Sequence, residues 1–140
     1  MLITEVKEKK TKVSIGLLID KNKILISSRK KNKIYNRLWE FPGGKVKKKE
    51  SNINALRREL FEELSIKIEP NSTKFFLNYT HRYRKLNLDL YFFTCVKWKG
   101  EVFPTEGQKI KWLKKDEIND SVLLPSNLIV LDKLRNELLI

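Results

Sequence analysis

The chain has very little cysteine and no long apolar stretch. Its 140 residues include a single cysteine, Cys95, so no disulfide can form within the chain. Cys95 lies in the apolar run LYFFTCV, where a buried structural thiol is expected rather than a nucleophile. The N-terminal stretch MLITEVKEKKTK is too charged for a secretion signal, and no segment reads as a membrane span. We therefore expect a cytoplasmic protein with no membrane partner.

Acidic residues are also scarce. The chain has 17 of them against 30 lysines and arginines, which gives a formal net charge of +13. That surplus has three explanations: steering of a polyphosphate substrate, binding of nucleic acid, or compositional drift toward lysine. The basic residues are spread over several clusters without interleaved aromatic side chains, which favours drift and steering. We expect no stable nucleic-acid partner.

The remaining composition is that of one globular domain. With 41% hydrophobic residues, a chain of 140 residues builds one core, whereas two domains would be cramped. No internal repeat or composition break divides it. We expect a single domain over residues 1–140 that acts as a monomer.

Apolar runs predict a sheet. Residues 11–19 and 24–28 are expected to form a hairpin across the turn between them. Residues 75–83 and 86–98 are expected to form an antiparallel pair. Shorter strands are expected at 66–68 and 109–113, and an amphipathic helix within 123–139.

The most informative charges lie between Gly44 and Ile66. Glu59, Glu62 and Glu63 are separated by three and four residues or are adjacent, so a helix gathers them on one side. Crowded carboxylates repel one another unless a positive charge lies among them, and Mg²⁺ and Mn²⁺ prefer oxygen ligands. The sequence therefore predicts a divalent-cation site on this helix.

The neighbours of the three acids support this prediction. An apolar stripe lies about a quarter turn away on the same helix: Ile53, Leu56, Leu60 and Leu64. The stripe should pack on the sheet and hold the acids at its edge. Arg58 precedes Glu62 by four residues, so its side chain can pair with that carboxylate.

A cap and a turn precede the helix. Ser51 and Asn52 are both suitable N-caps. Pro42, Gly43 and Gly44 form a turn that can bring bare backbone close to a ligand. The expected unit is a strand, a glycine turn, a loop and an acidic helix.

This segment resembles the Nudix box, the signature of the Nudix hydrolase superfamily. The box reads glycine, five residues, glutamate, seven residues, arginine-glutamate, an aliphatic residue, any residue, two glutamates, any residue, glycine and an aliphatic residue. The matching positions are Gly44, Glu50, Arg58, Glu59, Leu60, Glu62, Glu63 and Ile66. Ser65 stands where the family has a glycine that ends the helix in a left-handed conformation, so a strained or different C-cap is expected there.

Residues outside the box are similar to the MutT-type subgroup of this superfamily. They are the run LWEFPGGK at 38–45, Arg29, Glu106-Gly107-Gln108 followed by Trp112, and Asn127 in a Pro-x-Asn context. The resemblance covers nearly the whole chain and implies an α/β fold, an α/β/α sandwich with a mixed β-sheet. It also implies hydrolysis of a nucleoside triphosphate to its monophosphate and pyrophosphate, with 8-oxo-dGTP as the favoured substrate.

The resemblance further implies a metal site and a general base. The ion would be Mg²⁺, with Mn²⁺ as the alternative, and its ligands would be the Gly43 carbonyl, Glu59, Glu62, Glu63 and Glu106. Glu59, which adjoins Arg58, is the first choice for the base, with Glu62 and Glu106 as alternatives. Glu50 is expected to organise the loop through charge pairing.

The implied substrate contacts lie on both sides of the glycine turn. Arg29, at the end of a strand, could hold a phosphate or the base with its planar fork of donors. The amide of Asn127 both donates and accepts, which suits an oxidised guanine edge. The remaining expected contacts are Glu40, Phe41, Pro42, Gly43, Gly44, Lys45 and Tyr83, the last of them to the base.

Two alternatives stay open at this point. A Nudix hydrolase of another nucleotide, such as CTP or a modified pyrimidine triphosphate, would carry the same box. A non-catalytic basic Nudix module that binds RNA would account for the charge, but it has no physical reason to keep three mutually repelling acids. Hydrolysis measured over several nucleotides, with and without metal, separates these possibilities.

Overall fold

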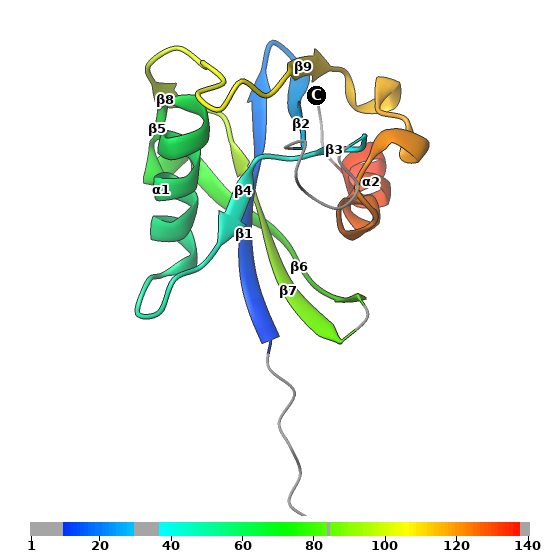
Figure 1. Ribbon diagram of the computed structural model, residues 1–140. Helices are drawn as coiled ribbons and strands as arrows, with labels where there is room; N and C mark the ends of the chain where they lie inside the picture. The colour runs from blue at the N-terminus through cyan, green and yellow to red at the C-terminus, as the bar shows by residue number, and fades with distance from the viewer. Residues whose placement is uncertain (1–9, 30–36, 84, 138–140) are drawn as a thin grey trace, which may run out of the picture.

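The structure, a computed structural model, describes residues 10–29, 37–83 and 85–137. A seven-stranded sheet forms its centre. Two helices, α1 (Asn52–Leu64) and α2 (Pro125–Glu137), lie on opposite sides of that sheet (Figure 1). The predicted α/β/α sandwich is therefore confirmed. Neither helix is long and apolar enough to cross a membrane, and no other described helix is.

The sheet is mixed, as predicted. The strand order is β3-β2-β1-β7-β6, with β4 paired to β1 and β9 paired to β2. Their bounds are β1 Lys10–Asp20, β2 Lys23–Ser28, β3 Trp39–Glu40, β4 Gly43–Lys45, β6 Thr73–Tyr83, β7 Leu86–Cys95 and β9 Ile110–Leu113. β1 and β7 run parallel, and the other pairings between described strands are antiparallel. An isolated parallel bridge also joins Trp39 to Leu123. Three short 3₁₀ turns, Pro70–Ser72, Lys115–Glu117 and Asp120–Val122, complete the connections.

The predicted hairpin is confirmed. β1 pairs with β2 through Ile19 opposite Ile24, and the two residues of the turn, Lys21 and Asn22, have φ values of 50° and 64°. Positive φ at both central residues suits the right-handed twist of a two-residue hairpin.

The predicted strand over 86–98 needs a correction. β7 ends at Cys95, and the exposed residues Val96 and Lys97 take the chain out of the central sheet. Trp98 then begins a separate strand, β8 (Trp98–Lys99), which pairs with β5 (Lys67–Ile68). The ring of Trp98 stacks on Trp112 with centroids 6.2 Å apart, and this packing holds the second sheet beside α1 (Figure 1).

The two faces of the sheet carry two cores. Alternation along β1 sends Leu18 to the α1 side and Leu17 to the α2 side. On the α1 side the predicted stripe is fully buried at Leu56, Leu60 and Leu64. Cys95 lies in the same core, and burial raises the pKa of its thiol to about 12, which agrees with the predicted structural role.

Helix α1 is fixed at both ends. Ser51, one of the two candidate N-caps, accepts a hydrogen bond from the Asn54 N–H at 3.1 Å. Ser65 ends the helix with φ 58° and ψ 28°, the left-handed conformation expected at the family's glycine position, and its N–H donates to the Phe61 carbonyl. The helix that presents the acids is therefore held in one register against the sheet.

Candidate active site

Two glycines of β4 allow close contacts, Gly43 with β1 and Gly44 with the acidic helix. Gly43 and Gly44 lie opposite Ile15 and Ser14 of β1. A Cβ atom on Gly43, whose φ is +150°, would lie 2.2 Å from the Ser14 carbonyl oxygen. One on Gly44 would lie 2.3 Å from Cδ of Glu59. The Glu59 carboxylate therefore occupies the space that any side chain at Gly44 would need.

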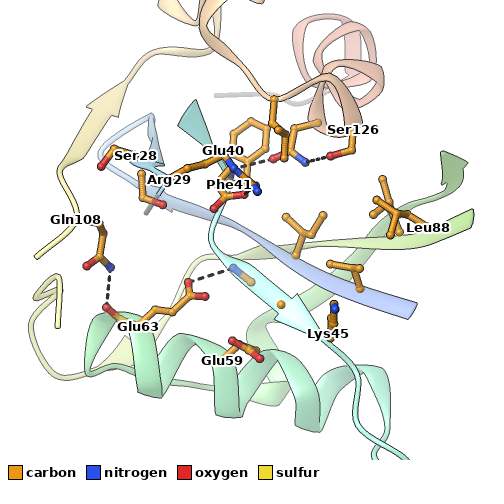
Figure 2. A pocket seen from close by; sticks show the side chains of 18 of the residues that line it. Ser28, Arg29, Glu40, Phe41, Lys45, Glu59, Glu63, Leu88, Gln108 and Ser126 are labelled. Carbon is orange, nitrogen blue, oxygen red and sulfur yellow. Dashed lines mark hydrogen bonds and ion pairs between the residues drawn. The ribbon is translucent and has the colours of Figure 1, made fainter. Parts of the chain in front are cut away.

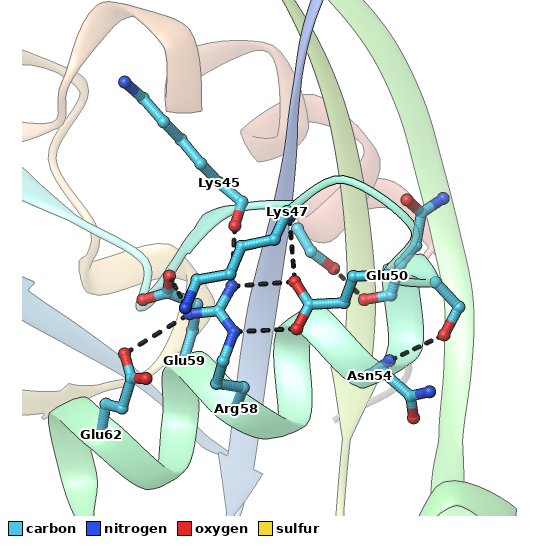
Figure 3. A network of polar contacts seen from close by, with 10 residues as sticks. Lys45, Lys47, Glu50, Asn54, Arg58, Glu59 and Glu62 are labelled. Carbon is cyan, nitrogen blue, oxygen red and sulfur yellow. Dashed lines mark hydrogen bonds and ion pairs between the residues drawn. The ribbon is translucent and has the colours of Figure 1, made fainter.

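Arg58 organises the outer rim of the site (Figure 3). Its Nε and Nη2 donate to the two carboxylate oxygens of Glu50 at 2.8 and 2.9 Å, and Nη2 also donates to the Lys45 carbonyl at 2.9 Å. Its Nη1 donates to Glu59 at 2.8 Å and to Glu62 at 3.4 Å. We call these five residues the rim network. A planar fork of donors can hold such an arrangement, whereas a single ammonium group cannot.

The rim network compensates the negative charge of Glu50. Hydrogen bonds from Arg58, and then from the Lys47 N–H, lower the pKa of Glu50 to about 2. The same contact with Glu50 is the main cause that raises the pKa of Arg58. The predicted roles of Glu50 in the loop and of Arg58 as the partner of Glu62 are both confirmed.

Glu63 has the opposite environment (Figure 2). Its carboxylate accepts one long hydrogen bond, 3.4 Å, from the Gly43 N–H. Burial, followed by the negative charges of Glu59, Glu40 and Glu106, raises the pKa of Glu63 to about 8. A buried carboxylate among other carboxylates is a place that a cation stabilises.

A cavity of about 460 Å³ adjoins Glu63. Glu59 and Glu106 line it together with Glu63, and the apolar side chains of Val13, Ile15, Leu88 and Leu90, called the apolar wall below, line it as well. Volumes of this size are usual for sites that bind small molecules. The cavity therefore offers a ligand both a strongly acidic region and an apolar surface.

Most residues predicted from the sequence line this cavity: Arg29, Glu40, Phe41, Gly43, Gly44, Lys45, Glu59, Glu63, Glu106 and Asn127. Pro42 is buried, and its carbonyl accepts a hydrogen bond from the Gly16 N–H. Glu62 is not among the lining residues, because its side chain is 52% exposed and turns to Arg58. The predicted base contact of Tyr83 concerns a side chain that lies outside the described residues.

The donors of the cavity fit a hard divalent cation. Glu59, Glu63 and Glu106 supply carboxylate oxygens, which are the ligands such ions prefer. Within residues 10–29, 37–83 and 85–137, no three acidic, histidine or cysteine side chains converge as a finished metal cluster. The Glu62 carboxylate contacts Arg58, and the Glu63 carboxylate accepts from the Gly43 N–H. The roles predicted for individual ligands stay predictions.

Asn127 reaches the cavity from the first turn of α2. Its Oδ1 accepts a hydrogen bond from the Phe41 N–H at 2.9 Å, which joins residues 86 positions apart. Its Nδ2 has a longer contact, 3.4 Å, with Ser126 Oγ. The protein therefore engages the oxygen of this amide, and the Nδ2 group is the part best placed to donate to a ligand.

Arg29 and Glu40 meet at the same cavity. An ion pair of 2.7 Å joins Nη1 of Arg29 to Glu40, with both side chains partly buried. The two residues predicted to contact substrate from neighbouring strands thus hold each other in place.

Sequence reasoning missed the apolar wall. Alternation along β1 put Val13 and Ile15 on one face, but the parallel register, in which Val13 lies opposite Leu90, brings β7 beside them. It also assigned no role to Gln108, which lines the cavity. The spacing of Gln108 in a motif was visible, whereas its contacts were not.

Fold and site together define an α/β/α protein in which a strand, a glycine turn and an acidic helix border a ligand cavity. The chain belongs to the Nudix family, whose NUDIX domain model matches residues 9–134. The resemblance to the Nudix box is therefore confirmed. Members of this family generally need a divalent metal ion.

Several curated relatives share most of the chain. It is 43% identical to the 8-oxo-dGTP diphosphatase of Buchnera aphidicola subsp. Schizaphis graminum, over 79% of this chain and 82% of the relative. It is 30% identical to the 8-oxo-dGTP diphosphatase of Escherichia coli K12, over 91% and 98%. The CTP pyrophosphohydrolase of the same strain is 29% identical, over 84% and 87%.

Solved structures agree on the fold. The crystal structure of a MutT Nudix hydrolase from Burkholderia pseudomallei superposes with a TM-score of 0.81 and covers 91% of this chain and 99% of that chain. Its sequence identity is 22%, so this likeness shows the fold alone.

Proposed function

We propose that this protein is a metal-dependent nucleoside triphosphate pyrophosphohydrolase that converts 8-oxo-dGTP to 8-oxo-dGMP and pyrophosphate. The observation that carries the proposal is the cavity, which is lined both by the acids Glu59, Glu63 and Glu106 and by apolar side chains and the Asn127 amide. A triphosphate can approach carboxylates only with cations between them, while a purine needs apolar surface and a directional hydrogen bond. The relative with 43% identity supports this substrate.

Glu59 is the residue that takes the proton from the attacking water. Arg58 Nη1 holds one of its oxygens at 2.8 Å and the backbone of Gly44 lies against it, so the carboxylate has a fixed direction. The other oxygen can then accept the proton while pyrophosphate leaves. Glu106, which lines the cavity, is the second candidate, and the exposed Glu62 is the weakest of the three.

Glu59, Glu63 and Glu106, with the Gly43 carbonyl, would hold Mg²⁺. When bound, the ion would neutralise the triphosphate and lower the pKa of the attacking water. Lys45, exposed at the edge of the cavity, attracts the phosphates. The nucleotide is thus the partner, in keeping with the expected cytoplasmic location.

Base recognition falls to the apolar part of the cavity. The side chains of Leu88 and Leu90 offer an apolar surface, and Asn127 Nδ2 donates to an oxygen of the oxidised purine. CTP is the second candidate substrate, because a relative named for that activity is 29% identical. Asn127→Ala should lower kcat/KM for 8-oxo-dGTP more than for CTP.

A substrate panel tests the proposal. Purified protein is given 8-oxo-dGTP, dGTP, CTP and a methylated dCTP, with Mg²⁺ or with EDTA, and pyrophosphate release is measured. The highest kcat/KM should belong to 8-oxo-dGTP, with no release in EDTA.

Glu59→Gln should lower kcat by about 10³-fold and leave the thermal midpoint in place. A preference for CTP would move the assignment to the second candidate, and RNA binding without metal-dependent hydrolysis would replace it with the non-catalytic module.

A further inference from the structure

The segment that carries Glu106 is bound to the end of α1 by several hydrogen bonds. The last carbonyls of a helix have no partner within it. Here the Glu63 carbonyl accepts from the Thr105 N–H at 3.0 Å and the Leu64 carbonyl accepts from the Phe103 N–H at 3.0 Å. The Thr105 hydroxyl donates to the carbonyl of Glu62. The loop therefore caps the helix turn from which the acids project.

Gln108 adds a contact of a different kind. Its Nε2 donates to the Glu63 carbonyl at 3.0 Å (Figure 2), while its Oε1 accepts from the Glu106 N–H at 2.9 Å. One side-chain amide thus spans the backbone of two acids that line the cavity. Only a group with a donor and an acceptor at its end can make both bonds.

The turn that carries Glu106 is closed by a long hydrogen bond, 3.4 Å, from the Gly107 N–H to the Pro104 carbonyl. Glu106 and Gly107 are exposed, and a Cβ atom on Gly107, whose φ is +73°, would meet nothing within 4 Å. On its other side, Gln108 is followed at once by Lys109, whose N–H donates to Ser28 Oγ at 2.9 Å. Gln108 therefore lies where the loop passes from the end of α1 to the end of β2.

We propose that Gln108 is a positioning residue, whose amide sets the place of the Glu106 carboxylate relative to Glu63 across the cavity. Its role rests on the proposed function, in which both acids act on one metal-bound nucleotide. Without the amide, the bridge from the Glu63 carbonyl to the Glu106 N–H is lost, so the position of the Glu106 backbone relative to Glu63 is held less tightly.

The first test uses backbone amide exchange and needs neither metal nor substrate. Gln108→Met keeps the length of the side chain but has no amide, and Gln108→Glu keeps only the acceptor for the Glu106 N–H. The exchange of that N–H should be slow in the wild type and in Gln108→Glu, and fast in Gln108→Met. Thr105→Val, which removes the hydroxyl bond to Glu62, is the control and should leave it slow. Fast exchange in the wild type, or slow exchange in Gln108→Met, would overturn the proposal whatever the enzyme hydrolyses.

The second test asks whether Gln108 acts through Glu106. Binding of Mn²⁺ alone is measured by calorimetry for the wild type, Gln108→Met, Glu106→Gln and the double variant. Gln108→Met should weaken Mn²⁺ binding by about tenfold when it is introduced into the wild type. When it is introduced into Glu106→Gln, it should leave Mn²⁺ binding almost unchanged. An equal loss in both backgrounds would mean a merely structural role and would overturn the proposal. Because no nucleotide is present, this outcome is independent of which substrate the protein prefers.

Discussion

Glu50 lies in the loop just before α1 and Glu63 lies in the last turn of that helix, yet the two carboxylates have opposite surroundings. Glu50 receives hydrogen bonds from Arg58 and from the Lys47 N–H, and its pKa falls to about 2. Glu63 is partly buried near other carboxylates and accepts a long bond from the Gly43 N–H, and its pKa rises to about 8. The chain supplies its own cation where a carboxylate shapes the loop, and supplies further negative charge where a carboxylate faces the cavity. The negative charge of the rim is thus compensated within the protein, whereas the negative charge of the cavity is compensated by a bound ligand.

For the comparison between rim and cavity, the largest expected effect comes from breaking the rim with Arg58→Lys. A lysine keeps the charge but cannot bridge Glu50 and Glu59 as the planar fork does. The displaced Glu59 should lower kcat on 8-oxo-dGTP by about 10²-fold. Arg57→Lys, at the exposed neighbouring position, is the matched control and should leave kcat unchanged. Equal values of kcat for the two variants would show that the rim does not position Glu59.

The cavity side of the comparison is tested by Glu63→Gln in EDTA. The pKa of Glu63 in the folded chain, about 8, lies above its ordinary value of 4.5, so folding favours the protonated form. The stability that this preference contributes is full below about pH 4.5 and is lost as the pH rises through about 8. At about pH 9 the neutral variant should therefore be more stable than the wild type, by on the order of 5 kcal/mol. Urea unfolding over a pH series measures the difference, which should shrink toward acidic pH.

Glu50→Gln is the counterpart and should have the opposite sign. The pKa of Glu50 in the folded chain, about 2, lies below the ordinary value of 4.5. Its charged form therefore stabilises the fold above about pH 4.5, and this contribution is lost as the pH falls through about 2. In neutral buffer Glu50→Gln should lower the urea midpoint, while Glu63→Gln should raise it. Shifts of the same sign would remove the distinction between rim and cavity.

The unit around α1 could be predicted because its signals are local. The N-cap at Ser51, the buried stripe and the pairing of Arg58 with Glu62 each depend on residues a few positions apart. The hairpin of β1 and β2 is equally local, with Lys21 and Asn22 as its turn. Patterns of this kind specify an element and the face it presents.

The sequence could predict most of the residues that line the cavity but not their arrangement, because that arrangement depends on segments far apart in the chain. The hydrogen bond from the Phe41 N–H to Asn127 Oδ1 joins residues 86 positions apart, and no local sequence pattern predicts that the side-chain oxygen of Asn127 accepts it. Helical spacing likewise puts Glu62 and Glu63 on similar sides of α1. Arg58 draws Glu62 outward to the rim, so that Glu63 alone of the two faces the cavity.

The smallest expected effect concerns the end of α1, just beyond Glu63. Ser65 has φ 58° and ψ 28°, a left-handed conformation that costs a residue with a Cβ atom about 1 kcal/mol and costs glycine almost nothing. The bond from its N–H to the Phe61 carbonyl is a backbone bond, which glycine keeps. Ser65→Gly should therefore raise the free energy of unfolding by about 0.5–1 kcal/mol and leave kcat within about twofold, as urea unfolding and pyrophosphate release will show. A fall in kcat together with the gain in stability would mean that this cap also sets the direction of Glu63, and the cavity would then depend on the helix end as much as on the rim.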